Sequence, residues 1–104
     1  MNVATVTAWR VAPGRNADFM ELIAKAKAIQ EGNGGRVRLF QAALAGEATG
    51  TITVLIEHDD LAAYSAFQAS LQADTDYLAL GATAYGADAP AAMLSHSLVN
   101  ELEV

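Results

Sequence analysis

The stretch TITVLIEHDDLAAYSAFQASL, residues 51–71, contains the change of periodicity that decides the fold. Up to His58 its side chains alternate between two sets, which is typical of a β-strand with two different faces. Beyond Asp60 the apolar residues recur every three or four positions, as on one face of a helix; they are Leu61, Tyr64, Phe67 and Leu71. The stretch therefore predicts a strand over 51–58 and a helix over about 60–73, begun by an aspartate cap.

The chain before this stretch opens with another strand followed by a helix. Residues 3–11 alternate and are rich in β-branched side chains, which indicates a strand. A turn at 12–15 ends it, and Asn16 is suited to cap a helix that runs to about Glu31. The glycines of residues 32–35 then end that helix.

The remaining segments complete a sheet. Residues 36–44 predict a strand, and the glycine-containing loop 45–50 joins it to the strand 51–58 as an antiparallel hairpin. A short helical turn is expected over 74–80, followed by an alanine- and glycine-rich loop over 81–90 and a last strand over 93–102.

The predicted order β, α, β, β, α, β defines an α+β fold of the ferredoxin-like kind. Right-handed crossovers place the two main helices on one face of a four-stranded antiparallel sheet. The length of 104 residues suits a single domain over residues 1–104.

The alternating strands also predict which side chains face the helices. On the first strand, the small row Ala4, Val6 and Ala8 is expected to pack under the helices, leaving Thr5, Thr7 and Trp9 on the open face. On the third strand the row toward the helices is Ile52, Val54 and Ile56. An open face carrying Trp9, Phe40 and Leu55 is more apolar than monomers usually expose, so we expect a second copy to cover it as a homodimer.

Composition excludes several classes of partner. Six basic residues against twelve acidic ones give a net charge of −6, which disfavours nucleic acid and anionic membrane surfaces. Cysteine is absent, and neither a signal sequence nor an apolar run long enough to cross a membrane is visible. We expect a cytoplasmic protein with no metal site and no cofactor, because no metal-ligand or phosphate-binding motif is present.

Three segments give the chain a resemblance to a known superfamily. They are Val11-Ala12-Pro13-Gly14-Arg15, the hairpin segment Phe40-Gln41-Ala42, and Glu57-His58-Asp59-Asp60-Leu61-Ala62-Ala63-Tyr64. The layout resembles the dimeric α/β-barrel superfamily, including the antibiotic-biosynthesis-monooxygenase-like and NIPSNAP-like proteins, and looks closest to an uncharacterised branch. This resemblance implies a dimer in which two sheets form a barrel, and a pocket in each protomer for an aromatic or polyketide-like molecule.

The cofactor-free oxygenases of that superfamily tend to place an asparagine on the first strand, near a tryptophan and a histidine or arginine. Here the first strand offers Trp9, while Thr5 and Thr7 occupy its centre. The candidate pocket residues are Thr7, Trp9, Arg38 and Phe40 as ligand-binding residues and His96 as the catalytic base. An imidazole can exchange a proton near neutral pH, although a strand histidine is more often simply hydrogen-bonded.

Other candidate residues can be explained by a structural role as well as by ligand binding. Arg38 beside Phe40 suits an anionic aromatic ligand, or else protects an edge strand from aggregation. His58 is expected to contact the helix start rather than a substrate, whereas Tyr77 and Tyr85 could form a lid. The pattern leaves open which face of the last strand carries His96.

The sequence thus predicts a homodimeric protein that binds a small molecule. The enzymatic form of this prediction is a cofactor-free, monooxygenase-like enzyme that acts on an aromatic or polyketide-like compound. The alternative is a non-catalytic interaction or stress-associated module whose dimer is itself the functional form.

Overall fold

The computed structural model describes residues 2–104, with residue 48 described only by its place in a short 3-10 helix. The elements in chain order are β1 (Val3–Val11), α1 (Asn16–Gly32), β2 (Arg36–Gln41), η1 (Gly46–Ala48), β3 (Ile52–His58), α2 (Leu61–Gln72), α3 (Thr75–Ala84) and β4 (Ala91–Asn100). None of the helices among the described residues is long and apolar enough to cross a membrane.

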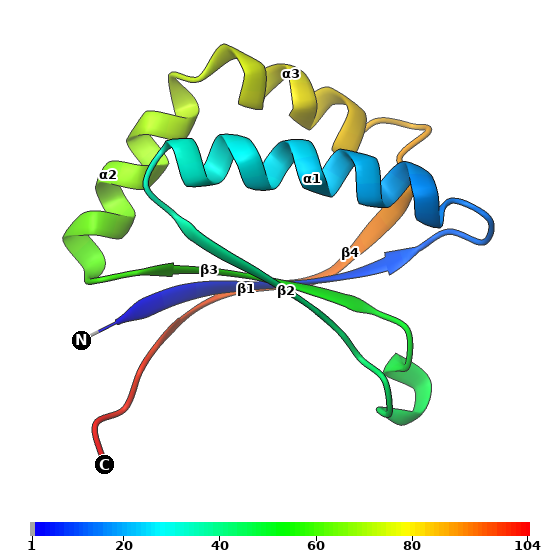
Figure 1. The fold of residues 1–104 in the computed structure, drawn as a ribbon, viewed down its shortest axis with the longest axis horizontal. Helices are drawn as coiled ribbons and strands as arrows, with labels where there is room; N and C mark the ends of the chain where they lie inside the picture. The colour runs from blue at the N-terminus through cyan, green and yellow to red at the C-terminus, as the bar shows by residue number, and fades with distance from the viewer. Residues whose placement is uncertain (1) are drawn as a thin grey trace.

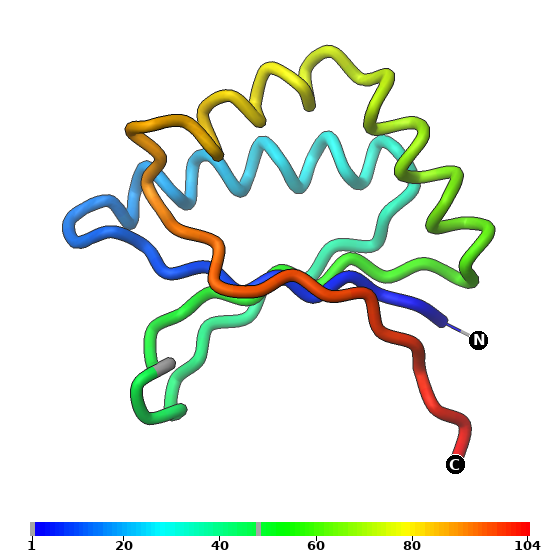
Figure 2. The backbone as a smooth tube through the Cα atoms, turned by 180° about the vertical axis from the view of Figure 1, so that it is seen from behind, coloured from blue at the N-terminus to red at the C-terminus, as the bar shows by residue number. Residues whose placement is uncertain are grey.

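The four strands form one antiparallel sheet in the order β2-β3-β1-β4. All three helices lie on one side of it, and the other side is left uncovered (Figure 1). Seen from behind, the β2–β3 loop and the C-terminal segment both extend away from the helices (Figure 2). This arrangement is the predicted ferredoxin-like fold, with one more helix than the two main ones expected.

The extra helix is α3, where the sequence predicts only a short turn. Asp74 caps it by accepting a hydrogen bond from the backbone N–H of Tyr77 at 3.1 Å. The alanines beyond Leu80 have high helix propensity and carry the helix to Ala84, despite Gly81. The expected loop over 81–90 is therefore confined to residues 85–90.

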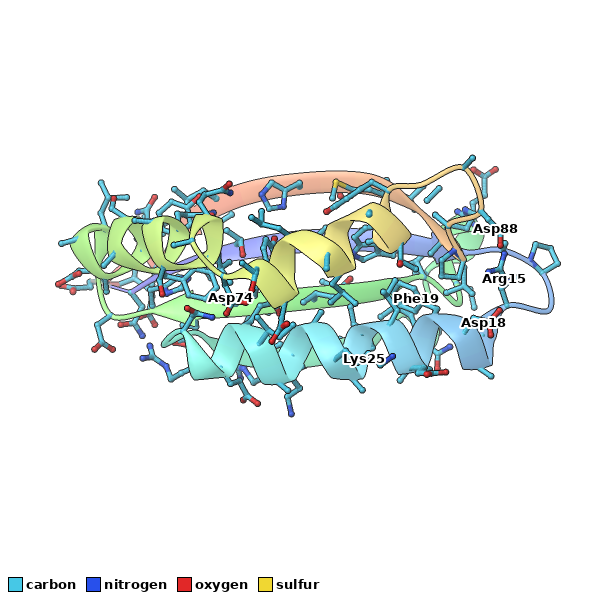
Figure 3. The ribbon with its side chains drawn as sticks, turned by 90° about the horizontal axis from the view of Figure 1, so that it is seen from above. Arg15, Asp18, Phe19, Lys25, Asp74 and Asp88 are labelled. Carbon is cyan, nitrogen blue, oxygen red and sulfur yellow. The ribbon has the colours of Figure 1, made fainter. Side chains whose placement is uncertain are left out.

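Other boundaries also differ from the prediction, and β4 spans Ala91–Asn100 rather than 93–102. Asn16 does not cap α1: Arg15 holds the cap position without a side-chain cap, and its guanidinium bonds Asp18 and Asp88 instead (Figure 3). Strand β2 ends at Gln41 rather than residue 44, because the chain turns into the η1 loop and leaves Leu44 95% exposed.

The predicted orientation of β3 is confirmed, and that of β1 is wrong. Ile52, Val54 and Ile56 are buried under the helices as expected. In the register of the sheet, Trp9, Thr7 and Thr5 pair with these three residues in turn, and paired residues share a face. Thr5, Thr7 and Trp9 therefore face the helices, and Val6 and Ala8 lie on the open face.

The core lies between the sheet and the helices. From α1, Phe19 and Ile23 are buried, and from α2, Phe67 and Leu71. Phe67 and Leu71 belong to the apolar stripe that defines the second predicted helix, so that prediction is confirmed. Strand β4 is exposed along nearly its whole length, because no helix lies over this edge of the sheet.

Candidate ligand site

A cavity of about 280 Å³ lies between the helix-facing side of the sheet and the three helices. This is close to the lower end of the roughly 300–1,000 Å³ usual for small-molecule pockets. Met93 of β4 lines the cavity and is 40% exposed. His96 of the same strand also lines the cavity and is exposed, so the cavity opens to solvent beside the uncovered edge strand.

One end of the cavity is aromatic. The ring of Trp9 lies 5.9 Å from that of Phe19 and 5.9 Å from that of Tyr85, tilted against both. Trp9 comes from the sheet, Phe19 from α1 and Tyr85 from the end of α3, so three elements converge here. Rings at this separation contact one another, so they form one aromatic wall against which a further aromatic ring can pack.

A polar pair lies next to this aromatic end. Thr7 and His96 are directly opposite each other on β1 and β4, and Thr7 Oγ1 is 2.7 Å from His96 Nδ1. When Nδ1 carries the ring hydrogen, it donates to Thr7 Oγ1 and leaves the Nε2 lone pair free to accept a proton. The threonine hydroxyl thus orients an imidazole at the open side of the cavity.

Two glutamines, Gln30 and Gln68, supply the side-chain amide groups of the cavity lining. Gln68 of α2 donates a hydrogen bond from Nε2 to the Tyr64 hydroxyl at 2.9 Å. Gln30, near the end of α1, has a buried Oε1 with no hydrogen-bond partner among the described residues.

Formal charge is absent from the lining, since none of the described residues that form it is Asp, Glu, Lys or Arg. The pKa of Tyr85 is raised, first by partial removal of its hydroxyl from water and then by Tyr77. The Tyr85 hydroxyl therefore remains a hydrogen-bond donor at neutral pH. Such a cavity favours a neutral ligand, because an ion would lose its hydration without gaining a countercharge.

The structure brings together three of the five residues predicted for the pocket. Thr7, Trp9 and His96 all line the cavity, on the helix side of the sheet rather than the open side. Arg38 and Phe40 do not line it, because they alternate with the helix-facing Val37 and Leu39 of β2.

Arg38 and Phe40 instead lie together on the open face. The guanidinium of Arg38 lies over the Phe40 ring at 5.9 Å and forms a 3.2 Å ion pair with Glu57. Arg36 also approaches Glu57, at 3.8 Å. These contacts involve the protein's own groups and lie on the opposite side of the sheet from the cavity.

His58 is 2% exposed and lies outside the cavity lining. Its ring packs against Phe67 at 4.6 Å and against Tyr64 at 5.5 Å, both on α2. Burial, and then the nearby charge of Arg36, lower the pKa of His58. This buried position agrees with the expectation that His58 contacts the helix rather than a substrate.

The sequence prediction missed the part of the lining that comes from α1. Gln30 lies four residues after Ala26 and continues the apolar stripe that begins at Phe19. A glutamine on an otherwise apolar stripe is the signal that could have identified it. Tyr77 and Tyr85, considered above as a lid, do line the cavity.

Across the described part of the chain, no three His, Cys, Asp or Glu side chains are grouped so that they could hold an ion.

Comparison with solved structures places this fold among known proteins. SnoaB from Streptomyces nogalater, described as a cofactor-independent oxygenase, superposes with a TM-score of 0.70 over 99% of this chain and 95% of its own, at 21% identity. An uncharacterised NIPSNAP domain protein from Burkholderia xenovorans gives 0.73, covering 98% and 95% at 14% identity. A putative antibiotic biosynthesis monooxygenase from Bordetella bronchiseptica gives 0.62, covering 98% of each chain at 19% identity.

No protein-family model and no curated protein matches this sequence. The structural likenesses confirm the expected resemblance to monooxygenase-like and NIPSNAP-like proteins at the level of the fold. At these identities they show the shared ferredoxin-like fold, and the chemistry must be argued from the residues of this chain.

Proposed function

We propose that this protein is a homodimeric, cofactor-independent oxygenase that acts on a neutral aromatic or polyketide-like compound held in the cavity. The observation that carries the proposal is the Thr7–His96 pair at 2.7 Å, placed in the wall of an uncharged cavity beside Trp9. The aromatic end orients a planar substrate, and the imidazole accepts a proton from it. The oxygenase description of SnoaB, which shares the fold, supports the same reaction class.

Oxygenation without a cofactor requires the substrate to supply the electrons, so the substrate must first be deprotonated. His96 Nε2 takes a proton from an acidic methylene flanked by aromatic rings, and the carbanion passes an electron to O₂. The resulting radicals combine to a peroxide, which recovers the proton from His96 and loses water to leave a carbonyl. One O₂ is consumed for each methylene converted to a carbonyl and one water.

The homodimer is proposed from the uncovered side of the sheet. Its exposed apolar side chains include Phe40, 52% exposed, and Val99, 44% exposed, with Leu55 between their strands. Arg38 and Glu57 border the same surface with opposite charges, which suits a self-complementary contact. A second copy is therefore the partner that fits this face.

Oxygen uptake measured with anthrone tests the proposal. In anthrone, a methylene between two aromatic rings is made acidic by the opposite carbonyl. The wild-type protein should accelerate oxygen uptake, and His96→Ala should lower the rate by about 10²-fold or more, the usual contribution of a general base. Thr7→Val keeps the side-chain shape but removes the hydroxyl, and should lower the rate less, with recovery in Thr7→Ser.

Two results would contradict the proposal in different ways. Equal rates for wild type and His96→Ala would remove the imidazole from the mechanism. The absence of both oxygen uptake and binding of any aromatic compound would favour the alternative, a non-catalytic dimeric module.

A further inference from the structure

Gln30 carries a buried polar atom that the protein itself does not satisfy. Its Oε1 accepts no hydrogen bond among the described residues, whereas its backbone oxygen accepts from Asn33 at 3.2 Å and from Gly35 at 3.0 Å. The backbone oxygen of Gln30 is thus bonded within the α1 end, and the side-chain amide takes no part in the cap. A buried acceptor without a partner costs free energy of folding, because the same atom is hydrogen-bonded to water in the unfolded chain.

The lining to which Gln30 belongs is largely apolar, and its other polar side chains are Thr5, Thr7, Gln68, Tyr77, Tyr85 and His96. Ile56 and Phe67 pack closely around the turn at Gly35, and both line the same cavity as Gln30. An apolar residue at position 30 would extend the stripe of α1 at no polar cost. An amide oxygen left unpaired in the wall of a cavity is a group that a bound ligand can satisfy.

Gln30 lies at the opposite end of the cavity from the aromatic cluster. Phe19 and Gln30 are separated by eleven positions along α1, about 16 Å at the rise of an α-helix. Thr7 and His96 lie between these ends, since Thr7 is two residues along β1 from Trp9. An elongated molecule would extend from the three rings past the imidazole to Gln30. The buried Oε1 accepts a hydrogen bond from this molecule when the side-chain amide turns into the cavity.

We infer that Gln30 determines ligand specificity by accepting a hydrogen bond from a neutral donor, such as a phenolic hydroxyl, at the end of an elongated aromatic ligand. This inference rests on the proposed function, because it names the substrate class for the same cavity. A charged donor does not fit, since no carboxylate lines the cavity to balance it. A ligand with a methyl group at that position leaves the Gln30 oxygen unpaired and is bound less tightly.

Fluorescence provides a direct test, because Trp9 is the only tryptophan of the chain and lies in the cavity wall. The matched probes are 4-hydroxybiphenyl and 4-methylbiphenyl, which differ only in a hydroxyl replacing a methyl group. Titration of the wild-type protein should show quenching by both probes, with the hydroxyl compound bound roughly threefold to tenfold more tightly, the range of one net hydrogen bond.

The decisive variant is Gln30→Met, which keeps the length of the side chain and removes the amide. It should bind the two probes with equal affinity, and should unfold at the same temperature as wild type or higher. Gln72→Met is the matched control, because Gln72 is exposed at the end of α2 and lies outside the cavity lining. It should retain the preference for the hydroxyl compound.

The outcomes separate this inference from the function on which it rests. Binding of both probes with equal affinity to wild type, or an unchanged preference in Gln30→Met, would overturn the role of Gln30 and leave the aromatic site intact. A lowered unfolding temperature in Gln30→Met would indicate a structural role instead. Failure of both probes to quench Trp9 would overturn the aromatic site and the inference together.

Discussion

The imidazole of His96 owes its position to a single cross-strand pair. Thr7 and His96 lie opposite each other on neighbouring strands, so the hydroxyl of one reaches the ring nitrogen of the other at 2.7 Å. The β-branched threonine has restricted side-chain rotation, and this limits the positions that the imidazole can take. The sequence prediction named both Thr7 and His96. Their contact, however, depends on how two strands pair, and the two residues are 89 positions apart in the chain.

His58 makes the fold sensitive to mild acid. Its pKa is lowered in the folded state, so the unfolded chain binds the proton more tightly and stability falls as the pH drops through the ordinary value of 6.5. The loss continues until the pH reaches the folded-state pKa, below which it levels off. Asp59 opposes the shift, and Arg36 increases it.

Thermal unfolding between pH 7 and pH 5 tests this linkage. Wild type should lose stability across the range, and His58→Phe should lose less, because phenylalanine cannot bind a proton. Most carboxylates titrate below this window, with ordinary pKa values of about 4. Parallel curves for the two proteins would show that His58 does not contribute to the pH dependence.

At the level of the elements, packing rather than backbone conformation requires a glycine at position 35, in the turn between α1 and β2. A Cβ at Gly35 would lie 2.8 Å from Ile56 Cγ2 and 2.9 Å from Phe67 Cε1. Its φ angle is not in the left-handed region, unlike that of Gly34 at +100°. Close approach of β3 and α2 therefore requires a residue without a side chain at position 35.

Gly35→Ala should lower the free energy of unfolding by about 1–3 kcal/mol, the usual cost of overpacking. Gly32→Ala is the matched control, because nothing lies within 4 Å of the added Cβ and the residue belongs to α1. That control should be neutral or stabilising by up to about 1 kcal/mol. Chemical denaturation of the two variants measures both effects, and equal stabilities would contradict the packing argument.

The elements themselves were largely predictable from local pattern, whereas the faces of the strands were only partly so. Caps and periodicity define α2, because Asp60 and the stripe through Phe67 are local features. On β1 both faces carry side chains that suit burial, with Thr5 at 4% and Ala4 at 8% exposure. Only pairing with Ile56 and its neighbours decides which row faces the helices, and pairing is a tertiary property.

In the whole molecule, the proposed ligand site and the proposed dimer contact lie on opposite sides of the sheet. The helix side forms a cavity from residues of one chain, and the open side forms the proposed contact with a second copy. Arg38 and Phe40 were predicted to lie beside Trp9. They lie on the open side of the sheet, whereas Trp9 lies on the helix side. The two sides can therefore be disturbed independently.

Leu55→Asp should convert the protein to a monomer in sedimentation velocity, because it places a charge at the centre of the open face. Leu78→Asp is the control, since Leu78 is 50% exposed on α3 and lies outside the cavity lining. The monomeric variant should still bind 4-hydroxybiphenyl. A wild-type protein that sediments as a monomer would contradict the proposed dimer.

The most direct test of the central claim is to locate a bound aromatic compound by NMR. Addition of 4-hydroxybiphenyl to the ¹⁵N-labelled protein should shift the Trp9 indole resonance and the amides of Thr7 and His96. The amides of Arg38, Phe40 and Leu55 on the open face should change little. Shifts confined to the open face, or no shifts at all, would contradict the assignment of the helix-side cavity as the ligand site.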